Sequence, residues 1–370
     1  LATGVGLRLP AGPAIVCGAG PSLEHALPLL LQSTRNLTVI AADTALPVLH
    51  EHGVQPDLVV ALEGQLANLY DVLPVSRREY RLVADLSSHP ATARLHERRA
   101  WTLTQFAPVT LLDRVKQLPG VQLALPPLGS VGVSAVEIAL RSGVSPLFCT
   151  GLDFAVLPGK THARGAPAYR EELLTSNRLR PVRDRALGAK LIEARGSGGT
   201  VSTTYVLRGY AAELASTIGE RPGVAAVEPF GLSYGASEVS AQEARSWIEQ
   251  AAAGGHVRSS SAAASDEPND EEVAGRQRAI REFILGEIER LEALDLSNDS
   301  DEASLPTDCD YLACEIPDRI ETGTYLIAAA LCGRNLEVAG APPSMLGALT
   351  DKLEEIGIVF DYSGKVWKLT

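Results

Sequence analysis

The chain has 370 residues, 45% of them hydrophobic, and a formal net charge of −12 at pH 7. This length predicts about two domains, and the acidic balance argues against nucleic-acid binding, which needs a basic surface. No apolar stretch approaches the roughly 18 residues of a membrane span, and we expect no signal peptide. Five cysteines without metal-binding spacing favour reduced thiols and a cytoplasmic protein.

Short apolar runs alternate with helix-like segments over residues 11–245. The runs lie at 14–18, 37–43, 58–62, 81–86, 101–106, 121–125, 147–154 and 224–230. Near-continuous hydrophobicity is typical of buried parallel strands, so the pattern predicts an open, mostly parallel, Rossmann-like α/β sheet flanked by helices. Segments 130–143 and 201–219 have apolar residues at helical spacing and end in glycine, which predicts two of these helices.

The rest of the chain has a different character. Residues 251–275 are small, polar and acidic, and we predict a disordered linker over 246–275. Residues 276–370 are predicted as a small α+β domain, with helices over 276–294, 325–333 and 345–357. A hairpin with Ser363 and Gly364 in its turn follows them. The sequence assigns no task to this region.

The sequence GAGPSL follows the first predicted strand directly. Gly18 and Gly20 allow a tight turn and the close approach of an anion, and Pro21 suits the first helical position. Ser22 adds a hydroxyl, and free N–H groups with the helix dipole favour phosphate. Leu23 replaces the third glycine of the dinucleotide fingerprint, which indicates a mononucleotide rather than a nicotinamide cofactor. The alternative is a turn that needs glycine for structural reasons alone.

Other candidate residues follow later strands, because ligands of open α/β sheets bind outside the carboxyl ends of the strands. Asp43 ends the second predicted strand. This position is equally compatible with a carboxylate that binds a ribose and with a solvated aspartate that has no such role. Glu63 stands alone after the third, whereas Mg²⁺-dependent phosphoryl transfer favours paired carboxylates. Gly129 and Ser130 begin a helix, as a second anion-binding turn or as an N-cap.

The loop GLDFAVLPGKTHARG leaves the seventh predicted strand through Asp153. His162 lies in a polar stretch without apolar neighbours, and the ordinary pKa of histidine, near neutrality, suits a general base. Lys160 can hold a phosphate as a point charge. Residues 160–185 carry seven Lys and Arg against three Asp and Glu, which indicates an anionic ligand; a solvated loop or lid is the alternative.

The order of these motifs, with DTALPVLHEHGVQPD and GSVGVSA between the first and the last, resembles one known family. It unites the bacterial motility accessory factors with the archaeal 6-hydroxymethylpterin diphosphokinases, and the resemblance covers roughly residues 11–245. The first branch implies a sialyltransferase-type enzyme that transfers a nonulosonic, sialic-acid-like sugar from a CMP-activated donor to Ser or Thr of flagellin. The second implies pyrophosphate transfer from ATP, with Mg²⁺, to a pterin alcohol.

The first branch is favoured, because the diphosphokinase pattern has D-L-D-G after the third strand and this chain has ALEG. No cofactor or metal beyond the CMP-sugar substrate is then expected, and the partner is flagellin or another flagellar protein. A non-catalytic flagellar accessory scaffold is a third possibility. The oligomeric state is left open.

The resemblance assigns roles by matching position. It places Gly18, Gly20, Pro21 and Ser22 at the nucleotide phosphate, Asp43 and Glu63 in the nucleotide or sugar pocket, and Gly129 and Ser130 at the donor. Asp153 and His162 would serve the reacting centre, with His162 as base, and Lys160 would stabilise the departing phosphate. Thr161 and Arg164 complete the predicted donor site.

Overall fold

The structure is a computed structural model that describes residues 6–33, 35–75, 80–96, 98–104, 110–157, 160–179, 191–253, 267–292, 336–339, 360–363 and 366–369. The chain divides into two compact units, residues 1–106 with 115–284 and residues 107–114 with 285–370.

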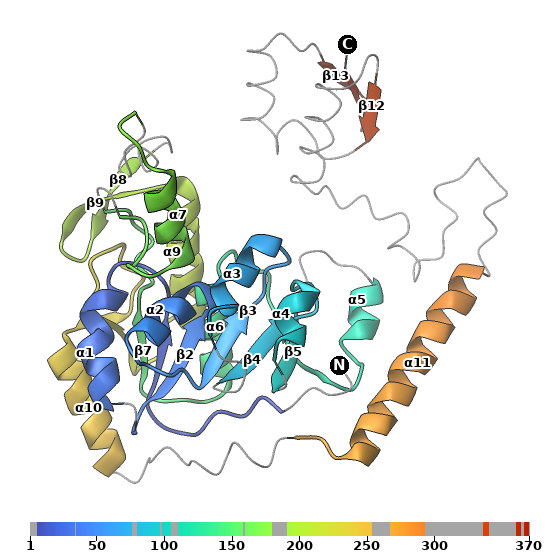
Figure 1. Cartoon of the computed structure of the whole chain (residues 1–370), viewed down its shortest axis with the longest axis horizontal. Coiled ribbons are helices and arrows are strands. Elements are labelled where there is room, and N and C mark those ends of the chain that lie inside the picture. Colours follow the sequence, from blue (N-terminus) through green and yellow to red (C-terminus); the bar gives the residue numbers. More distant parts are fainter. Residues whose placement is uncertain are drawn as a thin grey trace. The chain divides into compact units, whose positions relative to one another are not determined.

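A nine-stranded parallel sheet forms the centre of the first unit (Figure 1), in the order β11-β10-β7-β1-β2-β3-β4-β5-β6. Its strands are β1 (Ala14–Cys17), β2 (Thr38–Ala42), β3 (Leu58–Ala61), β4 (Arg81–Asp85), β5 (Arg99–Thr104), β6 (Val121–Leu125), β7 (Leu147–Thr150), β10 (Val224–Val227) and β11 (Ser237–Val239). The predicted α/β class and all eight predicted strands are confirmed.

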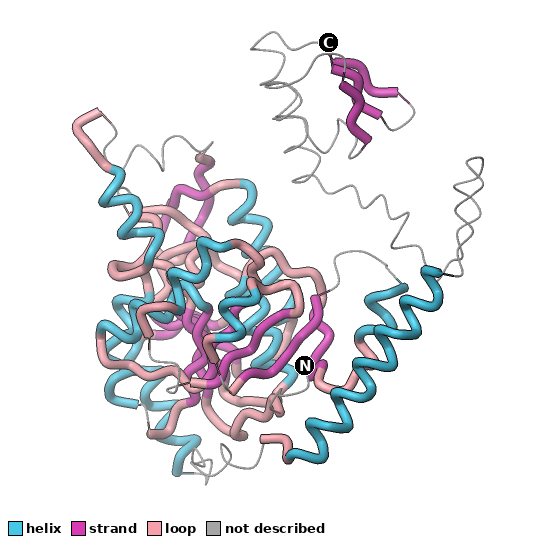
Figure 2. The backbone as a smooth tube through the Cα atoms, turned by 45° about the vertical axis from the view of Figure 1, so that its right-hand side comes forward, coloured by secondary structure: helices cyan, strands magenta, loops and turns pink. Residues whose placement is uncertain are grey.

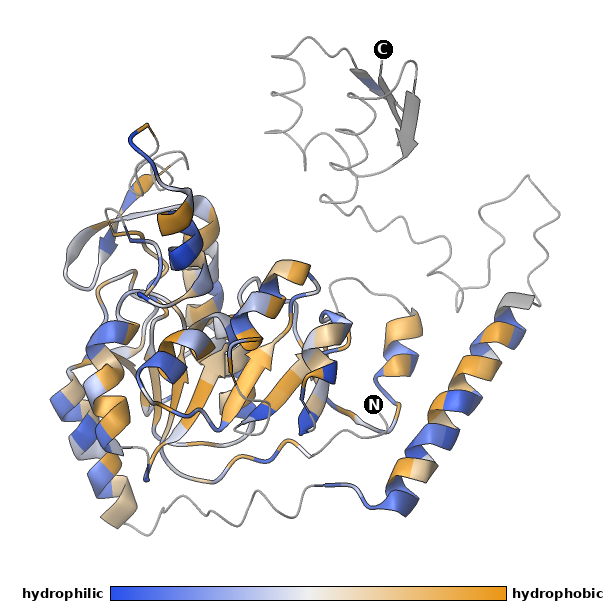
Figure 3. Ribbon diagram, in the orientation of Figure 1, coloured by the Kyte–Doolittle hydropathy of each residue, from blue (hydrophilic) through white to orange (hydrophobic). Residues whose placement is uncertain are grey.

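Helices cover both faces of this sheet (Figure 2). One face packs against α1 (Leu23–Ser33), α2 (Leu46–Glu51) and α10 (Ala241–Ala253), and the other against α6 (Val131–Arg141) and α9 (Tyr205–Ile218). Successive side chains of β1 alternate between the two cores, since Ile15 joins the first and Val16 the second. Both faces being covered explains why the central strands β1, β2, β3 and β7 are mostly hydrophobic along their length (Figure 3).

The remaining described elements of the first unit surround the sheet. They are η1 (Asp43–Ala45), η2 (Leu66–Asn68), α3 (Leu69–Val72), α4 (Pro90–Arg94), α7 (Pro167–Thr175), β8 (Ile192–Gly196) and β9 (Gly199–Thr203). Strands β8 and β9 form an antiparallel hairpin that the sequence analysis did not predict. The predicted helix 201–219 therefore starts later, at Tyr205, where the Thr204 side chain accepts a hydrogen bond from the Leu207 N–H at 3.1 Å.

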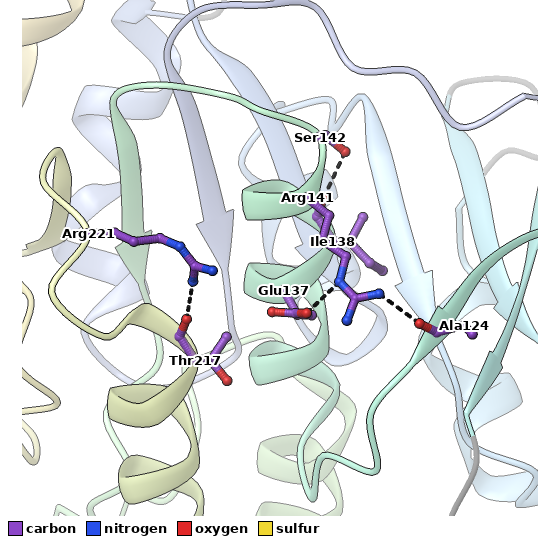
Figure 4. A network of polar contacts seen from close by, with 7 residues as sticks. All are labelled: Ala124, Glu137, Ile138, Arg141, Ser142, Thr217 and Arg221. Atoms are coloured by element: carbon purple, nitrogen blue, oxygen red, sulfur yellow. Dashed lines mark hydrogen bonds and ion pairs between the residues drawn. The ribbon is translucent and has the colours of Figure 1, made fainter.

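The C-terminal end of α6 is fastened by its own side chains (Figure 4). Arg141 pairs with Glu137 through Nε and Oε1 at 2.5 Å, and its Nη1 donates to the Ala124 carbonyl at 2.8 Å, which ties the helix to β6. Ser142 donates from Oγ to the Ile138 carbonyl at 2.8 Å. A cation at this end also complements the helix dipole. These contacts hold α6 with its opposite end at the carboxyl edge of the sheet.

In the structure, helices occupy both ends of the predicted linker 246–275. Helix α10 continues to Ala253 because Ala244 and Ile248 pack into the core, at 0% and 1% exposure. Helix α11 (Asp270–Glu292) begins with a capping box, in which the Glu272 N–H donates to Asn269 Oδ1 at 2.9 Å and the Asn269 N–H donates to Glu272 Oε2 at 3.1 Å. Residues 254–266 lie outside the described part.

The second unit contains α5 (Thr110–Val115) in large part and a three-stranded antiparallel sheet of β12 (Leu336–Ala339), β14 (Val366–Leu369) and β13 (Phe360–Ser363). The predicted hairpin is confirmed, but Ser363, predicted in its turn, is the last residue of β13 and pairs with Val366. The predicted helices over 325–333 and 345–357 lie outside the described residues. Within the described ranges, no helix is both long and apolar enough to cross a membrane.

Candidate functional site

A cavity of about 530 Å³ lies at the carboxyl edge of the sheet, lined from the ends of β1, β2, β3 and β7 and from the start of α6. Its volume is within the range of about 300–1,000 Å³ for small-molecule sites. The strand order reverses beside β1, which has β2 on one side and β7 on the other. The cavity is thus at the topological switch point, where open α/β sheets bind ligands.

The cavity brings together many of the predicted site residues. Those that line it are Gly18, Gly20, Asp43, Glu63, Gly129, Ser130, Asp153, Thr161 and His162. Pro21, Ser22, Lys160 and Arg164 do not line it. The binding and catalytic roles assigned to all of them stay predictions.

Several N–H groups of the GAGPSL turn bond within the protein. Gly18 donates to the Thr150 carbonyl at 2.9 Å and Gly20 to the Gly151 carbonyl at 2.8 Å. The Ser22 N–H donates to Asp153 Oδ2 at 2.9 Å. The place at the start of α1 that was predicted to take a nucleotide phosphate therefore holds the chain's own carboxylate. The reason is the loop after β7, which folds back over the turn.

The glycines of this turn permit a close crossing of two chain segments. A Cβ atom on Gly18 would lie 2.4 Å from the Gly151 carbonyl oxygen, and one on Gly20 would lie 2.3 Å from Asp153 Oδ2. Neither distance is possible for a real side chain. The structural alternative weighed for the turn thus has a specific cause, the contact between the loops that follow β1 and β7.

Asp153 is 4% exposed, and burial raises the pKa of its carboxyl to about 6, while the hydrogen bonds from Ser22 act in the opposite direction. The Ser22 hydroxyl also accepts a hydrogen bond from the Gly151 N–H at 2.9 Å. Asp153 is therefore held in place on one side by α1, and it lines the cavity on the other.

Asp43 has an unused oxygen at the cavity. The residue is 1% exposed; Oδ1 accepts from the Thr44 N–H at 2.8 Å, while Oδ2 has no hydrogen-bond partner among the described residues. Burial, then the charges of Asp71 and Glu63, raises the pKa of Asp43 to about 8. At pH 7 Asp43 is thus mostly protonated, and a neutral carboxyl can donate as well as accept a hydrogen bond.

The start of α6 supplies a second group of N–H donors. Ser130 occupies the N-cap position, but its side chain accepts no hydrogen bond from the helix. Ser130, Val131 and Gly132 all line the cavity. The Gly129 N–H just before them donates to Glu213 Oε2 at 2.9 Å. Since the N-terminus of a helix favours negative charge, the three cavity-lining residues at this end of α6 are placed to meet an anionic ligand.

The loop after β7 is fastened beside the cavity. The Ala163 N–H donates to the Ala19 carbonyl at 2.8 Å, and the Arg164 N–H donates to Glu24 Oε1 at 2.6 Å. Lys160, predicted to stabilise a departing phosphate, is instead paired with Glu24, with 2.7 Å between Nζ and Oε2. Its ammonium group is thus neutralised by α1.

His162 is partly buried, although the sequence suggested an exposed histidine. Desolvation lowers the pKa of its imidazole, and the charge of Glu172 acts in the opposite direction. Nδ1 lies 2.9 Å from Thr161 Oγ1, and the same hydroxyl donates to Glu172 Oε1. A neutral imidazole at the edge of a cavity is a competent proton acceptor.

Sequence reasoning missed several residues of the site. Gln65 and Asn68 line the cavity shortly after Glu63, and Leu207 and Tyr210 line it from α9. The strand-end rule could have found the first two, since they follow β3. Nothing in the sequence marks the α9 residues or Glu172, because they come from helices that reach the site through packing.

Residues 7–159 match the family described as 6-hydroxymethylpterin diphosphokinase MptE-like. Among solved structures, the MAf glycosyltransferase from Magnetospirillum magneticum AMB-1 is similar with a TM-score of 0.50 and 18% identity, over 70% of this chain and 40% of that chain. At this identity the likeness shows a shared fold.

Curated relatives match shorter parts. An uncharacterized protein of Treponema pallidum (strain Nichols) is 34% identical over 163 residues, which is 43% of this chain and 28% of that protein. A UDP-N-acetylglucosamine 1-carboxyvinyltransferase of Helicobacter hepaticus is 50% identical over 50 residues, 14% of this chain and 12% of the enzyme. That of Koribacter versatilis is 55% identical over 49 residues, 13% of this chain and 11% of the enzyme. The chain therefore spans under a third of each relative, and sequence reasoning did not anticipate the carboxyvinyltransferase matches.

The sheet order and the cavity at its switch point define an open, doubly wound domain of the Rossmann-like class. The match of residues 7–159 to the 6-hydroxymethylpterin diphosphokinase MptE-like family confirms the resemblance inferred from the motifs for this part of the chain. His162 lies just beyond the matched residues, whereas Asp153 of the same loop lies within them.

Proposed function

We propose that the α/β unit is a glycosyltransferase that transfers a nonulosonic, sialic-acid-like sugar from a CMP-activated donor to a Ser or Thr hydroxyl of flagellin or another flagellar protein. The fold shared with the MAf glycosyltransferase supports a transferase of this kind. The observation that carries the proposal is that His162 and the start of α6 line one cavity.

In the proposed reaction, His162 accepts the proton of the acceptor hydroxyl. The acceptor oxygen forms a bond to the anomeric carbon of the sugar, and the bond from that carbon to the phosphate oxygen breaks. CMP leaves with the bonding electron pair, and the N–H groups at the start of α6 balance its charge. The N–H groups of Gly18 and Gly20 take no direct part, because they are already bonded within the protein.

A pyrophosphoryl transfer from ATP is the second candidate, favoured by the description of the matching family. It requires Mg²⁺, which binds carboxylate and phosphate oxygens. In the described part of the chain, no three His, Cys, Asp or Glu residues are grouped so as to hold a metal ion. Mg²⁺ can also bind through one or two carboxylates together with the phosphates of a substrate, so its effect on nucleotide binding distinguishes the two candidates.

Calorimetric titration of the full chain with CMP and with ATP, each with and without Mg²⁺, separates the candidates. We expect CMP to bind equally well in both conditions. Mg²⁺-dependent ATP binding without a response to CMP would overturn the glycosyltransferase in favour of the diphosphokinase. The absence of binding by either nucleotide would favour the non-catalytic scaffold.

A further inference from the structure

Three polar side chains form a chain of hydrogen bonds that ends at the cavity. Thr161 and His162 come from the loop after β7, and Glu172 comes from α7, the helix that follows this loop. Thr161 Oγ1 lies between the other two, 2.9 Å from His162 Nδ1 and in contact with Glu172 Oε1. Glu172 itself does not line the cavity, so it can act on a ligand there only through its partners.

The direction of these hydrogen bonds follows from the inventory of hydrogens. An ionised carboxylate only accepts, so the single hydrogen of the Thr161 hydroxyl points to Glu172. The hydroxyl can then only accept from His162, which places a hydrogen on Nδ1 and leaves Nε2 unprotonated. This is the tautomer that a general base requires. The Glu172 carboxylate, linked to His162 through two successive hydrogen bonds, thus determines which ring nitrogen of His162 is free to take a proton.

Glu172 is also poorly compensated in its own surroundings. It is 9% exposed, and its Oε2 has no hydrogen-bond partner in the described part of the chain. A buried carboxylate that lacks partners gains stability from any positive charge that appears nearby. Two cations near the loop already have other partners, because Glu24 of α1 binds Lys160 and Glu51 of α2 binds Arg170.

We propose that Glu172 is a positioning residue, which acts through the Thr161 hydroxyl to fix the Nδ1–H tautomer of His162 and to stabilise the imidazolium formed in the reaction. The inference rests on the proposed role of His162. When the acceptor O–H bond breaks, the proton goes to Nε2 and stays there until product release. No proton moves along Thr161 to Glu172, so the carboxylate acts by its charge and its hydrogen bond alone.

The first test is NMR of the ring nitrogens of His162 in the ¹⁵N-labelled full chain, which needs no substrate. We expect Nδ1 to be protonated and Nε2 unprotonated in the wild type. In Glu172→Gln the amide can donate to Thr161, whose hydroxyl then points to Nδ1, so the proton should move to Nε2. Loss of the carboxylate charge should also lower the pKa of His162 further. Glu171→Gln, at the neighbouring exposed position, should change neither.

The second test is kinetic. Glu172→Gln and Thr161→Val should each lower kcat about 10²-fold or more with little change in KM, and the double variant should be no worse than either single one. Thr161→Ser keeps the hydroxyl and should restore most of the rate. An unchanged tautomer in both Glu172→Gln and Thr161→Val overturns the inference even if the sugar is transferred. The predicted tautomers without sugar transfer refute only the proposed function.

Discussion

The Ser22 N–H and the Asp153 carboxylate, 131 residues apart in the sequence, are joined by a hydrogen bond of 2.9 Å. This contact gives the start of α1 a negative partner from within the chain, as the dipole of the helix favours. A phosphate in the cavity then has no donor in the Ser22 N–H, whereas the start of α6 lines the cavity and favours an anion.

Substitution of Gly20 by alanine tests the contact with Asp153. The new Cβ would lie 2.3 Å from Asp153 Oδ2 and 2.7 Å from the Gly151 carbonyl oxygen. We expect Gly20→Ala to lower the free energy of unfolding by about 1–3 kcal/mol, the usual effect of overpacking, as measured by urea denaturation.

The control for this substitution is Gly209→Ala, in the exposed part of α9, where a Cβ would have no neighbour within 4 Å. Alanine is preferred over glycine inside a helix, so the free energy of unfolding should rise by about 0.5–1 kcal/mol or stay unchanged. Equal effects of the two substitutions would contradict the close crossing of the loops.

Asp43 should make the stability of the protein depend on pH. Its pKa is about 8 in the folded chain, against an ordinary value of 3.8. The folded state thus keeps a proton that the unfolded state releases, and the free energy of unfolding falls between about pH 4 and pH 8. The contribution is present below pH 4 and is lost as the pH rises through 8.

An asparagine side chain cannot ionise, so Asp43→Asn should flatten this fall, as measured by urea denaturation at about pH 5, 6.5 and 8, which span the range between the two pKa values. Glu249→Gln, an exposed change on α10, should leave the wild-type pH dependence in place. A slope in Asp43→Asn as steep as in the wild type would show that Asp43 is ionised throughout this range.

His162→Ala should abolish sugar transfer and leave CMP binding nearly intact, because the base acts on the acceptor. General bases contribute about 10²–10⁴-fold to rates. Since desolvation lowers the pKa of His162, the rate in the wild type should rise with pH and reach its plateau at a lower pH than for an ordinary histidine. Turnover of the His162→Ala variant at the rate of His52→Ala, an exposed control, would remove His162 from this role.

Gly129→Ala tests the wall of the cavity. A Cβ there would lie 2.2 Å from Tyr210 Cε1, so the tyrosine must move. Because Tyr210 lines the cavity, we expect CMP affinity to fall about tenfold, or roughly 1.4 kcal/mol, in calorimetric titration. Gly198→Ala meets no atom within 4 Å and should bind as the wild type does. Equal affinities of the two variants would place the nucleotide away from Tyr210.

The sheet could be predicted because parallel strands that are buried on both faces are hydrophobic at every position. Strand β11 could not, since its residues Ser237 and Glu238 are exposed at the edge of the sheet. The β8–β9 hairpin was not predicted from the sequence for a related reason: its strands are only partly buried, and β9 runs directly into α9.

The candidate site was predictable at strand ends and unpredictable where helices supply it. Four of the predicted residues follow neighbouring strands of the sheet, so the strand order determines that they lie close together: Asp43, Glu63, Asp153 and His162. The partner of His162 did not follow from any spacing, because Glu172 reaches Thr161 only through the way α7 packs against the loop. The sequence left both interpretations of the turn at Ser22 open, since a glycine-rich turn looks the same in sequence whether its N–H groups meet a ligand or the chain itself.

The close contact between Gly18 and Gly151 limits how the loops after β1 and β7 can change in evolution. Each glycine leaves room for the backbone of the other, since a Cβ on Gly151 would lie 2.1 Å from the Gly18 carbonyl oxygen. Neither segment can acquire a side chain at this point while the other stays as it is. Chains of this fold that have lost one of the two glycines should therefore have rebuilt both loops together.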